Sequence, residues 1–362
     1  MQHLTTVLTS SAGVFALLAA SWLYARKMRP DLSATVRLGM HLFVPCLSFQ
    51  AILDSRLTAT AFATAAGATA IQIGCGVLVG LVAVRLAGWR GRNEYLLPVA
   101  FVNAANLPFP LLLAIFGPDG LSIGVVCFTV TNIAIYSLGI VLLHGRGQLR
   151  KALAEPALWA TAAAGVLRLA GIRLPEPVLA PVRLAGVAAI PLMLVLFGDS
   201  LARARLSALR PALVITGARY IAGALALLVM LPLLKPTGLL RTVLVLYALL
   251  PPAMINVVLV RSAGRDDEGV AGAVLLGTLF ALVVIPLFWP WCARRSSAER
   301  TDRDRPLEGS PDGHDAHLLD PAAARVSQHG GDHGGDLRSR HHLRAIPAFA
   351  QSVPDRRVGG SG

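Results

Sequence analysis

Residues 95–117 read YLLPVAFVNAANLPFPLLLAIFG. The stretch is apolar enough to enter a bilayer, yet it contains Asn103, Asn106, Pro108 and Pro110 within eight residues. Each proline lacks a backbone N–H, and its ring clashes with the carbonyl four residues earlier, so a regular helix cannot continue through the pair. Lipid offers no water to the backbone groups that are set free. The stretch therefore predicts a broken transmembrane helix that faces protein or a polar cavity. A proline-kinked packing helix is the plainer alternative.

The composition of the chain indicates an integral membrane protein. Of 362 residues, 55% are hydrophobic and only 15% are charged, which is more apolar surface than a soluble core can hide. The formal charge of +13 would suit nucleic acid, but the arginines cluster between apolar runs, so membrane topology explains them better. We predict an all-α integral membrane protein with no nucleic-acid partner. The cysteines lie singly in apolar segments and predict no disulfide or redox motif: Cys46, Cys75, Cys127 and Cys292.

The apolar runs predict ten transmembrane helices. Every second connection between them is basic, from RKMRP at 26–30 to Arg261 and Arg265. By the positive-inside rule these connections are cytoplasmic, so both termini are predicted outside. The connection between the sixth and seventh spans breaks the contrast, because it is also basic. The predicted spans are 4–24, 36–54, 59–86, 95–116, 120–143, 152–171, 178–201, 207–234, 239–260 and 268–291.

Ten spans divide into two groups of five, and the ninth span echoes the fourth. It reads LVLYALLPPAMINVVLV and carries adjacent prolines followed by an asparagine, Pro251, Pro252 and Asn256. Because each half has an odd number of spans, the second half must be inserted upside down relative to the first. Interrupted helices at corresponding positions of inverted halves indicate a transport site. We predict a first repeat over 1–148 and a second over 149–292.

From Ala293 onward the composition changes to Arg, Asp, Gly, His and Pro without an apolar face. Such a composition predicts a disordered polar tail over 293–362. The tail contains HGGDHGGD at 329–336, but histidines in a flexible polar segment rarely form a specific site. We therefore predict no metal.

Several segments, in order, resemble the auxin efflux carrier family, which includes malonate and dicarboxylate permeases. The resemblance covers about residues 4–291 and implies two inverted five-helix repeats whose discontinuous fourth and ninth helices cross at mid-membrane. Ala104 and Ala105 stand where the family has other small residues, and Pro108 stands where it has glycine. The preferred substrate of the family is therefore not carried over. The segments are NAANLPFP at 103–110, FGPDGL at 116–121, VTN at 130–132, IPLMLVLFGDSLA at 190–202, RYIAG at 219–223 and PAMIN at 252–256.

Such a crossing favours an anion. The N-terminus of each half-helix carries free N–H groups and roughly half a positive charge, which attracts a carboxylate. Asparagine amides add donors without leaving an unpaired charge in the empty site; hydrogen bonding between helices is their plainer role. The predicted substrate-binding residues are Asn103, Asn106, Pro108, Pro110, Pro252, Asn256 and Arg219.

Arg219 is the clearest charge inside a predicted span. Charged residues at such depth usually face a cavity or pair with another group. Arg219 can draw an anion inward, or hold a backbone carbonyl or Asp199; snorkelling to the interface is the alternative.

These observations predict a secondary transporter of the cytoplasmic membrane that moves a small organic anion, such as an auxin-like acid, malonate or another carboxylate. No enzyme activity and no cofactor are predicted, since the Walker pattern is absent and no catalytic constellation lies in the spans. A proton or sodium ion is the candidate coupling partner, and a homodimer stays open. The alternatives are a sodium-coupled symporter, a sodium/proton antiporter, and a membrane sensor that transports nothing.

Overall fold

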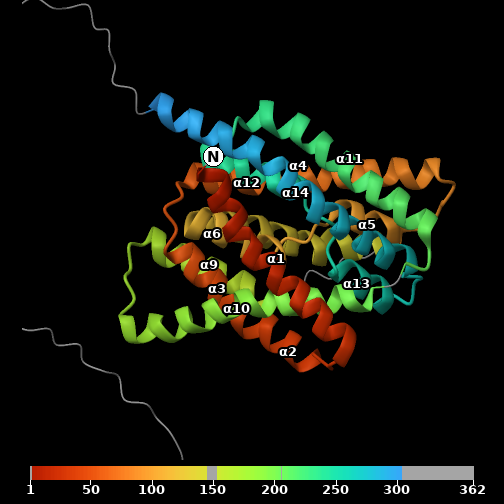
Figure 1. Cartoon of the computed structure of the whole chain (residues 1–362), viewed down its shortest axis with the longest axis horizontal. Helices are drawn as coiled ribbons and strands as arrows, with labels where there is room; N and C mark the ends of the chain where they lie inside the picture. Colours follow the sequence, from red (N-terminus) through yellow and green to blue (C-terminus); the bar gives the residue numbers. More distant parts are fainter. Residues whose placement is uncertain (1, 145–152, 205, 304–362) are drawn as a thin grey trace, which may run out of the picture. The chain divides into compact units, whose positions relative to one another are not determined.

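The computed structural model describes residues 2–144, 153–204 and 206–303, and every regular element in these ranges is helical (Figure 1). The helices are α1 (Gln2–Met28), α2 (Ser33–Leu38), η1 (Gly39–Phe43), α3 (Val44–Leu53), α4 (Ala59–Leu86), η2 (Asn93–Tyr95), α5 (Leu96–Ala100), α6 (Pro108–Ala134), η3 (Ile135–Gly139), α7 (Ile140–His144), α9 (Pro156–Leu169), α10 (Glu176–Arg203), α11 (Leu209–Leu234), α12 (Gly238–Ala248), α13 (Ile255–Ser262) and α14 (Glu268–Arg303).

Helix starts and stops follow local chemistry. The hydroxyl of Thr58 accepts a hydrogen bond from the N–H of Ala61 at 3.2 Å and caps α4. Gly117, with φ 67° and ψ −160°, adopts a backbone conformation that L side chains rarely take, and it kinks the run that begins at Pro108. The kink coincides with the predicted boundary between the fourth and fifth spans.

Within the described part of the chain, six helical stretches are long and apolar enough to cross a membrane. The two interrupted spans account for part of the difference from ten. Helices α5, α12 and α13 are too short to cross a membrane alone, and the α6 part of the fourth span is counted within Pro108–Leu143. The arrangement of ten spans in two inverted repeats remains a prediction. The six stretches are Ser33–Leu53, Ala59–Leu86, Pro108–Leu143, Glu176–Arg203, Leu209–Leu234 and Glu268–Ile285.

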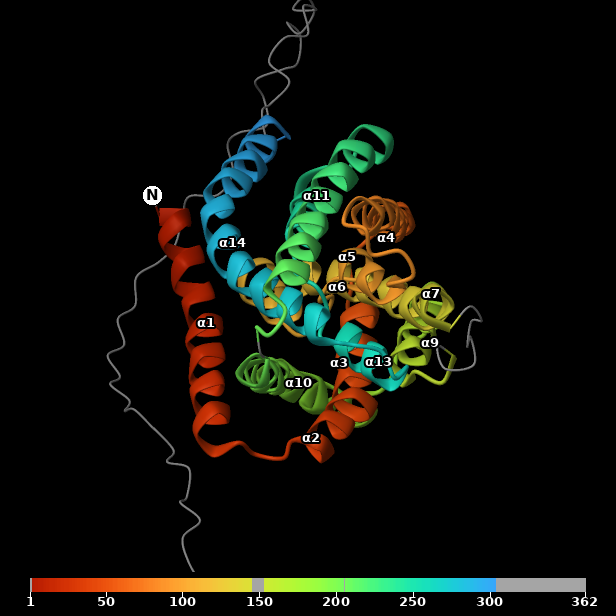
Figure 2. The same ribbon diagram turned by 90° about the vertical axis from the view of Figure 1, so that its right-hand side faces the viewer.

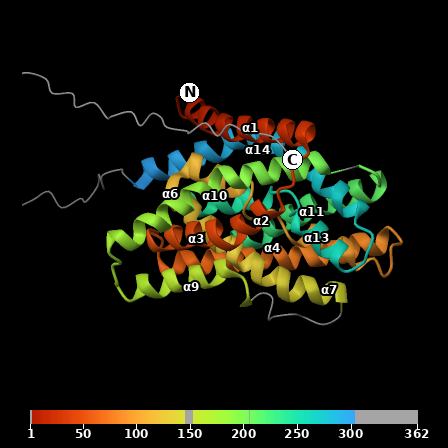
Figure 3. The same cartoon turned by 90° about the horizontal axis from the view of Figure 1, so that it is seen from below.

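Helix α6 lies between two groups of helices. On one side α1, α3, α9 and α10 pack on one another; on the other, α4, α5, α11 and α14 do so. Figure 2 shows α6 between α11 above and α10 below, and Figure 3 shows α9 alongside α3. The first turns of α6 are fully buried, with Phe109, Leu111 and Leu112 each 0% exposed. This burial makes α6 the centre of the core.

Three glycines bring helices against the two interrupted segments. A Cβ on Gly223 of α11 would lie 2.2 Å from the carbonyl oxygen of Ala248, and one on Gly76 of α4 would lie 2.5 Å from Cα of Ala100. A Cβ on Gly277 of α14 would likewise lie 2.6 Å from Cδ of Pro252. Small residues permit this close approach of helices in membranes.

One predicted boundary is wrong. Helix α14 continues to Arg303, so residues 293–303, which we assigned to the disordered tail, are helical. The apolar pattern ends near residue 292, but a helix needs no apolar face to continue for three more turns. The rest of the predicted tail, with its histidines, lies outside the described residues.

Candidate functional site

The first interrupted helix breaks before its prolines. Helix α5 ends at Ala100, Phe101 is extended, and α6 begins at Pro108. Proline suits the first position of a helix because its missing N–H would have no partner there. Pro108 and Pro110 therefore start the second half of the helix, whereas we expected them to lie within the break.

The second interrupted helix also breaks, but its prolines lie inside the break. Helix α12 ends at Ala248 and α13 begins at Ile255. Pro251 and Pro252 lie between them, and a residue that precedes proline is biased away from the helical region. Both predicted interruptions are thus present.

The two breaks cross and pair through their backbones. Val102 and Pro252 form an isolated antiparallel bridge. On either side, the N–H of Asn103 donates to the carbonyl of Pro251 at 2.8 Å, and the N–H of Ala253 donates to the carbonyl of Phe101 at 3.0 Å. Unwound backbone without water must find such partners. We call residues 101–103 and 251–253 the crossing.

Two predicted asparagines are oriented by this backbone. Asn256 is fully buried and its Nδ2 donates to the carbonyl of Phe101 at 3.0 Å. Oδ1 of Asn103 accepts from the N–H of Asn106 at 3.1 Å, which leaves Nδ2 of Asn103 buried without a partner. Since the partner of Oδ1 fixes the amide orientation, the free atom of Asn103 is a donor.

A cavity of about 260 Å³ adjoins the crossing, and we call it the polar cavity. Of the predicted site residues, Asn103 and Asn106 line it. None of the other five lines this cavity: Pro252 belongs to the crossing, Pro108 and Pro110 begin α6, Asn256 bonds to the carbonyl of Phe101, and Arg219 contacts the end of α12. The described lining has no Asp, Glu, Lys, Arg or His; it consists of Val36, Met40, Val102, Asn103, Ala104, Ala105, Asn106, Phe128, Thr131, Asn132, Ile135, Tyr136, Leu196, Ser200, Ala253, Met254, Ile255 and Val258.

Sequence reasoning missed two π-helical turns at this cavity. Turn η1 contributes Met40 and turn η3 contributes Ile135 and Tyr136. Single π-helical turns inside α-helices are frequent at functional sites. Asn132 also lines the cavity. No spacing of apolar residues signals a π turn.

Sequence reasoning also missed the role of Tyr247. It is 1% exposed, and its hydroxyl lies 2.9 Å from the carbonyl oxygen of Ala104 and 3.0 Å from that of Gly124. Nε2 of Gln72 donates to the carbonyl of Tyr247 at 2.9 Å. Tyr247 thus links both interrupted helices to α4 and α6. A tyrosine in an apolar run carries no sequence signal for this role.

Arg219 is 0% exposed and holds backbone carbonyls. Its Nη2 lies 3.2 Å from the oxygen of Ala248 and 3.4 Å from that of Tyr247, at the end of α12. Asp199, one of the partners we considered, instead pairs with Arg203 at 2.9 Å. Arg219 therefore holds the C-terminal end of α12, which precedes the crossing in the chain.

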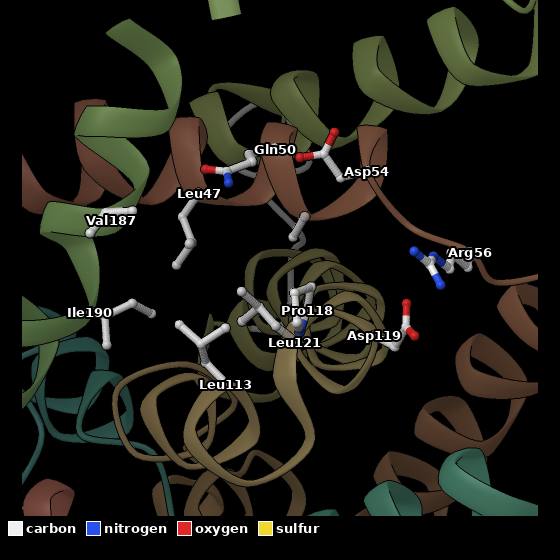
Figure 4. Close-up of a pocket in the computed structure, with 11 residues that line it drawn as sticks. Leu47, Gln50, Asp54, Arg56, Leu113, Pro118, Asp119, Leu121, Val187 and Ile190 are labelled. Carbon is white, nitrogen blue, oxygen red and sulfur yellow. The ribbon is translucent and has the colours of Figure 1, made fainter. Parts of the chain in front are cut away.

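A second cleft of about 510 Å³ lies between α3, α10 and the kinked start of α6 (Figure 4). The charged side chains of Asp54, Arg56 and Asp119 lie at one end of it, while aliphatic side chains such as Leu47 and Ile190 line the other. Within the described ranges, no group of three or more His, Cys, Asp or Glu residues is placed to hold a metal ion.

Comparison with known proteins identifies a transport family. A family described as membrane transport protein matches residues 12–154 and 148–289. An uncharacterized transporter of Methanothermobacter thermautotrophicus is 27% identical over 279 residues, which cover 71% of this chain and 88% of that protein.

Proposed function

The chain belongs to the membrane transport protein family, which is also called the auxin efflux carrier family. We therefore propose that it is a secondary active transporter that moves a small organic anion across the cytoplasmic membrane. The observation that carries the proposal is Nδ2 of Asn103, a buried donor without a partner at the polar cavity. Leaving such a group unpaired costs about 1–3 kcal/mol. A carboxylate oxygen in the cavity supplies the missing acceptor.

The surroundings of Asn103 favour a negative guest. Helices α6 and α13 both begin beside the cavity, at Pro108 and Ile255, and the N-terminus of a helix carries a partial positive charge. The described lining has no acidic side chain to repel an anion. A carboxylate is therefore stabilised without a buried cation in direct contact.

The lining also bears on the substrate class. Apart from a few amides and hydroxyls it is apolar, with Phe128, Leu196 and Met254 among its members. A monocarboxylate can bury the apolar part of the molecule against these side chains. The second carboxylate of a dicarboxylate would lie in an apolar environment without a partner. Among our candidates, an auxin-like monocarboxylate therefore fits better than malonate.

The two hollows support a mechanism of alternating access. The polar cavity and the second cleft are both lined by α10, through Leu196 and Ile190 respectively, and by α6. Six residues of helix span about 9 Å, so only a thin apolar layer separates the hollows along α10. A small shift of one helix group against the other opens one hollow and closes the other. In this proposal the basic connections face the cytoplasm, so that the polar cavity opens toward the cytoplasmic side and the termini lie outside.

The test is uptake of labelled carboxylates into proteoliposomes, under imposed proton and sodium gradients in turn. We expect an apolar monocarboxylate to be taken up and Asn103→Ala to reduce its uptake at least about tenfold. The matched control is Asn93→Ala, the same change at an exposed position, which should behave as the parent. Uptake that is equal in both variants would remove Asn103 from the site.

The alternatives predict other results in the same assay. A sodium-coupled symporter moves the anion only under a sodium gradient, and an antiporter moves sodium or protons without any anion. A sensor moves nothing, although it still binds its ligand.

A further inference from the structure

Arg219 carries a buried charge that no acidic side chain balances. It is 0% exposed in the middle of α11. In the described ranges its side chain forms no ion pair, whereas Asp199 and Glu94 each pair with other arginines. A buried unpaired charge is costly in a low-dielectric interior, so its retention needs a reason.

The compensation that the protein provides is partial. The two carbonyls that Arg219 contacts, Tyr247 and Ala248, are the last of α12. The free carbonyls at the C-terminus of a helix carry roughly half a negative charge. Among the described residues, Nε of Arg219 has no hydrogen-bond partner. The positive charge of Arg219 is therefore only partly balanced.

This charge lies close to the polar cavity but does not line it. Ala248, which Arg219 contacts, precedes the lining residue Ala253 by five positions. Tyr247 contacts Arg219 through its carbonyl and contacts Ala104, another lining residue, through its hydroxyl. The side chain of Tyr247 therefore links the carbonyl that Arg219 contacts to the lining of the cavity. In a buried environment a charge acts over such a separation without direct contact.

Resting on the function proposed above, we propose that Arg219 is the residue that selects anions, acting through the crossing on the carboxylate in the polar cavity. The empty transporter holds an incompletely balanced positive charge, and the bound anion completes the balance. Arg219 is a positioning and specificity residue that does not contact the substrate. Its charge therefore matters for carboxylates and not for neutral molecules of the same shape.

The experiment measures binding of phenylacetate and of its neutral isostere phenylacetamide to purified protein by calorimetric titration. We compare the parent with Arg219→Gln, which removes the charge, and Arg219→Lys, which keeps it. Arg210→Gln is the matched control, since it makes the same change at the exposed start of the same helix. We expect Arg219→Gln to weaken phenylacetate binding at least about tenfold, and Arg219→Lys and Arg210→Gln to weaken it less than about threefold. Phenylacetamide binding should be the same in the parent and in Arg219→Gln.

Three results would overturn the inference, in distinguishable ways. Equal weakening of phenylacetate and phenylacetamide in both Arg219 variants would assign the residue to the scaffold alone. Unchanged phenylacetate binding in Arg219→Gln would remove the charge from anion selection while leaving the proposed function intact. Failure of the parent to bind or transport any carboxylate would remove both.

Discussion

Val102 and Pro252, 150 residues apart in the chain, pair as an antiparallel bridge at the point where each interrupted helix is unwound. The flanking hydrogen bonds, from Asn103 to Pro251 and from Ala253 to Phe101, give the unwound backbone the partners that lipid cannot supply. Because backbone groups hold the crossing, Nδ2 of Asn103 is not needed there and has no hydrogen-bond partner among the described residues.

Removing one hydroxyl should loosen the crossing. Tyr247→Phe leaves the carbonyls of Ala104 and Gly124 without that donor. We expect a loss of stability of about 1 kcal/mol, and a higher KM for uptake because Ala104 lines the polar cavity. Thermal unfolding of the purified protein and uptake kinetics measure the two effects.

Tyr220→Phe is the control for this prediction. The hydroxyl of Tyr220 also donates to a carbonyl, that of Gly277, at 2.8 Å. It contacts α14 and does not reach Ala104, so stability should fall by a similar amount while KM stays unchanged. A KM that rises equally in both variants would show that any loss of stability impairs binding.

The close approach at Gly223 should tolerate no side chain. Gly223→Ala puts a methyl group about where the carbonyl of Ala248 lies, and this backbone atom cannot move aside without displacing the end of α12. We expect a loss of about 1–3 kcal/mol. Gly217→Ala is the matched control on the same helix, because nothing lies within 4 Å of its added Cβ. It should keep or raise the unfolding temperature, and a parallel fall in both variants would refute packing as the cause.

The interrupted helices could be read from sequence because their signal is local. Two prolines with nearby asparagines mark each break, and the boundary at Gly117 follows from its neighbours in the same way. The sequence did not show on which side of Pro108 the helix breaks, because proline stops one helix and starts the next equally well. Structure places the unwound residues just before it.

The contacts between residues far apart in the chain could not be predicted from the sequence. Gln72 and Tyr247 are 175 positions apart, and nothing in either segment points to the other. Arg219 was identified as a buried charge, but its contact with the end of α12 depends on how the helices pack. The π turns η1 and η3 likewise leave no trace in the apolar pattern.

The ion pair between Arg92 and Asp266, which joins two connections between helices, should depend on pH. The pKa of Asp266 is lowered by hydrogen bonds from the N–H of Glu268 and from Arg92, whose Nη1 lies 3.0 Å away. A lowered folded-state pKa means that the ionised form stabilises the fold above the ordinary value of about 3.9, and that this contribution is lost as pH falls through the lowered value.

Asp266→Asn isolates this contribution. The parent should unfold at a higher temperature than the variant at pH 7, and the difference should shrink below about pH 4. The effect is small because both partners are about half exposed. A difference that persists unchanged at pH 3 would assign it to something other than the charge of Asp266.

Substrate protection of one cysteine tests whether the polar cavity holds the transported anion. Ala105→Cys places a thiol on the lining, in a background in which Cys46, Cys75, Cys127 and Cys292 are replaced by serine. Maleimide labelling of this thiol should slow as phenylacetate is added, with half-protection at the concentration that gives half-maximal uptake. Labelling of Asn93→Cys, at an exposed position, should not change. A labelling rate at Ala105→Cys that stays constant at saturating phenylacetate, while uptake proceeds, would contradict an anion site at the crossing.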